Sequence, residues 1–150
     1  MIEVEVEDAA WSASIADVEA VVARAAKAAL GVATGTVTVL LSDDETVRDL
    51  NARFRGKDRP TNVLSFPAAA IPGADIQPLG DIVLGFGVCA DEARAQGRSL
   101  SDHLSHLTVH GVLHLLGRDH EDDVEAEAME AEEREILATL GVADPYLVTT

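Results

Sequence analysis

Cysteine and long apolar runs are both scarce in this sequence of 150 residues. Cys89 is the only cysteine, so no disulfide can form within the chain, and we expect a buried, inert thiol. No apolar run approaches the roughly 18 residues that a membrane span needs. The acidic, alternating start MIEVEVEDAA is unlike a secretory signal, which begins with basic residues. We therefore expect a cytoplasmic protein without membrane contacts.

Positive charge is also scarce, and it is unevenly distributed. Eleven Lys and Arg stand against 27 Asp and Glu, which gives a formal net charge of −16. Because nucleic-acid binding depends on neutralising phosphates, this total disfavours DNA as a partner. Five basic residues nevertheless lie between Arg48 and Arg59, and ten acidic ones between Asp119 and Glu135. We interpret the acidic segment as a solvated face, whereas the basic segment is either a solvated turn or a phosphate-binding site.

The composition and the local patterns predict a single α+β domain over residues 1–150. Apolar residues make up 47% and charged residues 25%, as in ordinary globular proteins. Alternating or β-branched segments predict four strands, at residues 2–7, 36–41, 62–66 and 81–86. Helical spacing predicts five helices. The first spans 15–30 with Ser14 as its N-cap, and the second runs from the capping box at Ser42 to about Phe54. The other three span 87–96, 100–116 and 121–140. We expect a mixed four-stranded sheet whose strand order the sequence does not reveal.

Three histidines near the end of the predicted helix at 100–116 form the most informative pattern. His110 and His114 are four residues apart, so their rings lie one turn apart on the same face. Gly117 permits a sharp reversal that can bring His120 back as a third ligand. Three neutral imidazoles leave zinc an open fourth position, as in catalytic rather than structural sites. We therefore predict one zinc ion per chain at the end of a central helix.

The spacing H-x-x-x-H-x-x-G-x-x-H matches the ligand spacing of metzincin proteases, but their general-base glutamate is missing. Gly111 stands in its place, and Met129 lies in an acidic helix rather than in a Met-turn. A glycine inside a helix costs about 1 kcal/mol relative to alanine, which suggests close approach of substrate or backbone. A hydrolase of another class fits better. His103 and His106 lie on the same helical stripe as His110. They could support the ligands, contact substrate or be ordinary surface histidines, and the sequence leaves all three interpretations open.

Three blocks of the chain resemble one known family. They are LNARFRGKDRPTNVLSFP at 50–67, LGDIVL at 79–84 and VHGVLHLLGRDH at 109–120. In content and order they are similar to the YbeY-type endoribonucleases, bacterial rRNA maturation factors with a three-histidine zinc site. The resemblance implies that His110, His114 and His120 are zinc ligands, and Arg55 matches the arginine that the family needs for activity. Arg118 departs from the aromatic residue common at its position, and it touches no ligand.

The resemblance implies a zinc-dependent endoribonuclease specific for single strands. Such an enzyme would mature the 3′ end of small-subunit ribosomal RNA and act in ribosome quality control, with small-subunit proteins as partners. Arg55 would then grip the scissile phosphate, because guanidinium matches phosphate oxygens and stays charged. Arg53, Lys57 and Arg59 would hold flanking phosphates. The nucleophile, water or the RNA 2′-hydroxyl, stays open.

Two alternatives remain at this stage. The first is a zinc peptidase without the usual glutamate base, favoured by the ligand spacing and disfavoured by Gly111. The second is a ribosome-assembly protein without catalytic activity, in which zinc only joins the helix end to the following loop.

Overall fold

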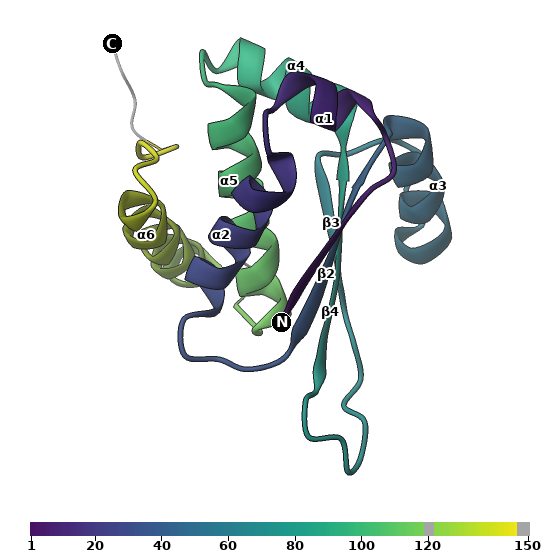
Figure 1. Cartoon of the computed structure of the whole chain (residues 1–150), viewed down its shortest axis with the longest axis vertical. Helices are drawn as coiled ribbons and strands as arrows, with labels where there is room; N and C mark the ends of the chain where they lie inside the picture. The colour runs from purple at the N-terminus through teal and green to yellow at the C-terminus, as the bar shows by residue number, and fades with distance from the viewer. Residues whose placement is uncertain (119–121, 147–150) are drawn as a thin grey trace.

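A four-stranded mixed sheet forms the centre of the molecule. The computed structural model describes residues 1–118 and 122–146 (Figure 1). The strands are β1 (Ile2–Val6), β2 (Thr36–Ser42), β3 (Val63–Pro67) and β4 (Pro78–Gly85). Their order is β1-β2-β4-β3; β1, β2 and β4 run parallel, and β3 pairs with β4 in the antiparallel direction. The four predicted strands and the α+β class are confirmed, and β3 lies at an edge, where Pro67 is tolerated.

Helices cover both faces of this sheet in layers. They are α1 (Ala10–Ser14), α2 (Val18–Leu30), α3 (Asp44–Arg55), α4 (Phe86–Ala95), α5 (Leu100–Leu115) and α6 (Asp123–Thr139). Figure 1 shows α2 and α5 on one face, α6 packed outside them, and α3 on the opposite face. None of the helices in the described ranges is long and apolar enough to cross a membrane.

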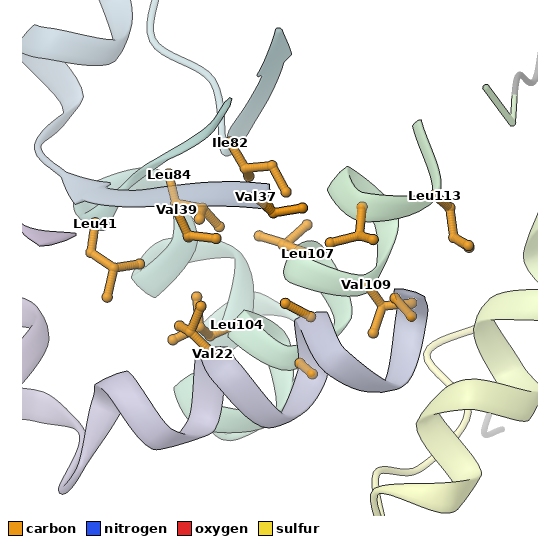
Figure 2. Close-up of a cluster of buried hydrophobic side chains, with 14 of the residues drawn as sticks. Val22, Val37, Val39, Leu41, Ile82, Leu84, Leu104, Leu107, Val109 and Leu113 are labelled. Atoms are coloured by element: carbon orange, nitrogen blue, oxygen red, sulfur yellow. The ribbon is translucent and has the colours of Figure 1, made fainter. Parts of the chain in front are cut away.

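The main core lies between the sheet and the α2–α5 layer. Alternate residues of β2 point to this side, so Val37, Val39 and Leu41 are fully buried. Figure 2 shows them facing Leu104 and Leu107 of α5. A smaller apolar cluster fills the space under α3. Cys89 is buried, as expected, and burial raises the pKa of its thiol far above the ordinary value, which keeps it inert.

The predicted helix at 15–30 begins only at Val18, and Ser14 is not its N-cap but the last residue of a separate short helix, α1. Between α1 and α2, Ile15 is extended and Asp17 adopts a left-handed φ of 53°. Trp11 explains the break, because its fully buried ring donates from Nε1 to the carbonyl of Ser42 at 2.9 Å. It also meets Phe86 edge-on, with ring centroids 5.1 Å apart. These long-range contacts fix α1, a helix that local periodicity did not predict.

The N-cap of α3 is one residue later than the capping box predicts. Ser42 is the last residue of β2, whereas Asp43 accepts a hydrogen bond from the backbone of Thr46 at 2.7 Å. The hydrogen bond from Thr46 lowers the pKa of Asp43. The helix itself is confirmed, and it continues to Arg55.

Gly111 lets α5 lie close against the sheet. A Cβ atom at Gly111 would lie 3.0 Å from Cδ1 of Ile82 on β4. The hydroxyl of Ser65 on β3 also lies 3.4 Å from the Gly111 carbonyl. The close approach expected at this glycine is therefore one of protein backbone and core side chains of the sheet to α5.

Replacing Gly111 with leucine should destabilise the fold by about 1–3 kcal/mol, because the added side chain must enter packed space around Ile82. Urea unfolding measures the effect. The matched control is Ala131→Leu on the exposed face of α6, which should change the free energy of unfolding by less than about 0.5 kcal/mol. Equal stability of the two variants would contradict this packing account.

Candidate functional site

A pocket opens between the edge strand β3 and the C-terminal half of α5. Its volume is about 190 Å³. The lining residues come from α3, β3 and α5, and they are Arg55, Val63, Leu64, Ser65, Pro67, His110 and His114. Segments more than 40 residues apart in the sequence thus meet at one place.

His110 and His114 face this pocket from successive turns of α5. Their ring centroids are 4.7 Å apart at an interplanar angle of 71°. The predicted shared face is therefore present. Gly117 follows with a φ of 91°, which permits the expected reversal of the chain. His120, the third predicted ligand, lies outside the described residues.

Arg55 brings the pocket its positive charge. It is the last residue of α3, and its Nη2 donates to the Ser65 carbonyl on β3 at 2.6 Å. The guanidinium carbon lies 5.6 Å from the centroid of the Phe66 ring, a cation–π distance. The structure therefore places the arginine singled out by the resemblance beside the two histidines.

The other three basic residues predicted to bind substrate do not line the pocket. Arg53 pairs with Asp49 at 3.3 Å on the exposed surface of α3. Lys57 and Arg59 are exposed in the turn that follows. Their contacts with flanking phosphates stay a prediction.

Glu133 of α6 is the main feature of the site that the sequence pattern did not reveal. It is fully buried, although it belongs to the acidic segment interpreted as solvated. Its carboxylate accepts from His110 Nδ1 at 2.5 Å, from His106 Nε2 at 3.2 Å and from the Tyr146 hydroxyl. Burial alone would raise its pKa, but hydrogen bonds from His106, His110 and Tyr146 outweigh that effect and lower the pKa to about 2. The carboxylate is therefore ionised.

A signal for this burial is present in the sequence. Met129 and Leu137 lie four residues before and after Glu133, and both are buried. A carboxylate between two apolar residues at this spacing shares their helix face. It is therefore turned toward α5 rather than toward solvent.

His103 is buried and His106 nearly so, and both contact other side chains of the protein, so the surface interpretation does not hold for either. Their side chains are 3% and 12% exposed. Arg98 Nη1 lies 3.2 Å from Nδ1 of His103 and 3.3 Å from Nδ1 of His106. Because guanidinium only donates, both Nδ1 atoms accept and both Nε2 atoms carry the proton. His103 then donates to Glu92 at 3.0 Å, and His106 donates to Glu133.

The donor set suits a zinc ion. The contact with Glu133 puts the proton of His110 on Nδ1, which leaves Nε2 as the nitrogen able to bind a metal. Within residues 1–118 and 122–146, no three His, Cys, Asp or Glu side chains converge into a metal-binding group. A metal at His110 and His114 therefore needs a further ligand, and His120 follows at the spacing that the sequence predicts.

Comparison with known proteins identifies the family. The family model described as Endoribonuclease YbeY matches residues 2–141. The chain is 52% identical to Endoribonuclease YbeY of Azorhizobium caulinodans, over 97% of this chain and 95% of that protein. It is 51% identical to Endoribonuclease YbeY of Paramagnetospirillum magneticum, over 97% and 94%.

A solved structure agrees with this likeness. The solution structure of a Thermotoga maritima protein superposes with a TM-score of 0.56 at 25% identity, covering 94% of this chain and 92% of that one. Because the family model matches this chain almost from end to end, the chain belongs to the endoribonuclease YbeY family, as the three sequence blocks predicted.

Proposed function

We propose that this chain is a zinc-dependent endoribonuclease that cuts single-stranded RNA and matures the 3′ end of small-subunit ribosomal RNA. Membership of the family supports hydrolysis of RNA. The observation that carries the finer proposal is the shared pocket of Arg55, His110 and His114. A fixed cation facing two imidazoles suits an anionic phosphodiester better than a neutral peptide bond.

Arg55 holds the scissile phosphate in this proposal. Guanidinium has five N–H donors, and the contact with the Ser65 carbonyl uses one of them. The side chain is thus anchored to β3 while further donors are available for phosphate oxygens. Charge and geometry both favour a phosphate ligand here, because the planar guanidinium fork matches phosphate oxygens.

His110, His114 and His120 hold the metal in this proposal. Bound zinc would supply Lewis-acid polarisation of a phosphoryl oxygen and a water of lowered pKa. Gly111 provides no carboxylate where zinc peptidases carry their general base, and its Cα faces Ile82 in the core. The peptidase alternative therefore lacks the residue on which its chemistry depends.

Phe54 supports specificity for single strands. Phe54 is 65% exposed and directly precedes Arg55 in the chain, and its ring meets Phe66 edge-on with ring centroids 5.6 Å apart. Unpaired bases stack on such aromatic rings, whereas paired bases cannot reach them. With a net charge of −16, the chain has weak general attraction for RNA, so we further propose that a small-subunit protein positions it.

Replacing Arg55 with alanine should reduce cleavage of a single-stranded RNA on the order of 10²-fold, because the fixed charge at the phosphate is lost. Zinc content should not change. Arg94→Ala is the matched control, since it removes an equal charge from an exposed pair with Asp91 on α4. Unchanged ribosome maturation with Arg55→Ala would favour the assembly protein with a structural zinc, and cleavage of denatured protein but not RNA would favour the peptidase.

Removing the metal with a chelator should abolish RNA cleavage, and added zinc should restore it, because the imidazoles do not replace the Lewis acid. His114→Ala should lose both metal and activity. Full activity in the metal-free protein would contradict the proposal. The ends of the products then identify the nucleophile, because the 2′-hydroxyl leaves a cyclic phosphate and water leaves a linear one.

Binding of free single-stranded RNA should depend only weakly on salt, because one arginine lines the pocket. If Arg55 holds the scissile phosphate and one neighbouring basic side chain holds a flanking one, about two contacts give a slope of log affinity against log salt of about −1.4. Filter binding between low and moderate salt measures it. A slope steeper than about −4 would mean that many phosphates are neutralised, and the role of a positioning protein would then be wrong.

A further inference from the structure

We propose that Glu133 is a positioning residue that fixes the His110 ring for metal binding, an inference that rests on the proposed zinc site. The carboxylate contacts Nδ1 of His110 at 2.5 Å from a different helix, α6. Nothing in the family resemblance or in the three-histidine pattern assigns a role to this residue.

The burial of Glu133 calls for a role beyond packing. A charged group removed from water costs several kcal/mol unless hydrogen bonds and partner charges offset the loss. Met129 and Leu137 on the same helix face show that apolar side chains pack well against α5. A methionine would fill a similar volume at position 133 without that cost, so packing alone does not account for a carboxylate there.

The two oxygens of Glu133 have separate partners, and this separation fixes the proton on His110. Oε2 accepts hydrogen bonds from the Tyr146 hydroxyl and from Nε2–H of His106. Nε2 of His106 carries the proton because Nδ1 of the same ring accepts from Arg98. Oε1 receives His110. With these two donors on Oε2, Oε1 is left to accept from Nδ1–H of His110, so the proton lies on Nδ1 and Nε2 is the nitrogen that would ligate a metal.

Two parts of the chain besides α6 hold the carboxylate in place, namely His106 and His110 of α5 and Tyr146 after α6. Arg98, just before α5, holds His106 in turn. The carboxylate therefore has little freedom to turn away from His110. A ligand ring held in this way binds its metal without first losing rotational freedom, and loss of such a partner weakens metal binding by 10- to 100-fold in order of magnitude.

Glu133→Gln tests the proposal because it keeps the shape of the side chain and replaces one of the two accepting oxygens with an NH₂ group. The amide oxygen should accept from His106 and Tyr146, so the NH₂ group faces His110. Nδ1 of His110 must then accept a hydrogen bond, and the ring proton moves to Nε2. Zinc affinity, measured by competition with a chromogenic chelator, should fall by about 10- to 100-fold. Nitrogen NMR of the metal-free protein should show the changed protonation of the His110 ring.

Glu135→Gln is the matched control, since it removes the same charge from an exposed position of α6 and should leave zinc affinity unchanged. If Glu133→Gln does not fold, Glu133→Asp keeps the charge but draws it back by one methylene, and it should bind zinc less tightly than the unaltered chain. Equal zinc affinity in a folded Glu133 variant and the unaltered chain would overturn the positioning role alone. No zinc binding by the unaltered chain would overturn the proposed function, and this inference with it.

Discussion

The burial of α5 between the sheet and α6 is the constraint on which the rest of the structure depends. One side of this helix carries Leu104 and Leu107 into the main core, and Gly111 lets it lie close to β4. Since an α-helix has 3.6 residues per turn, the orientation of its core face also sets the direction in which the histidine stripe points from another face. The stripe consists of His103, His106, His110 and His114. The packing that stabilises the domain therefore also aims the polar groups of the site.

The site itself lies where two unlike environments meet. On one side is the open edge of β3, whose Ser65 carbonyl anchors Arg55. On the other is the buried carboxylate of Glu133 behind His110. Positive charge thus stands at the solvent side of the pocket and negative charge behind the imidazole. This polarity is what the proposed metal ion facing a phosphate would need, and it places positive charge at the pocket of a strongly acidic chain.

Much of this could be predicted from the sequence, and the failures share one physical cause. The four strands, α5 and the pair His110 and His114 follow from local periodicity. The break before α2 does not, because it depends on the contact of Trp11 with Ser42, 31 residues away. The contacts of Glu133 depend on the fold for the same reason, although its spacing from Met129 and Leu137 signals that it is buried. Its histidine partners lie more than 20 residues earlier in the chain, and the acidic residues around it suggest a solvated surface. The strand order and the meeting of Arg55 with the histidines likewise need the fold.

The central claim is that one zinc ion binds at the pocket that holds Arg55. Anomalous X-ray diffraction at the zinc edge, from crystals of the zinc-loaded chain, tests it most directly. The account predicts a single strong peak between the imidazoles of His110, His114 and His120, on the side that faces Arg55. A peak among the carboxylates of the acidic segment, with none at the histidines, would contradict it.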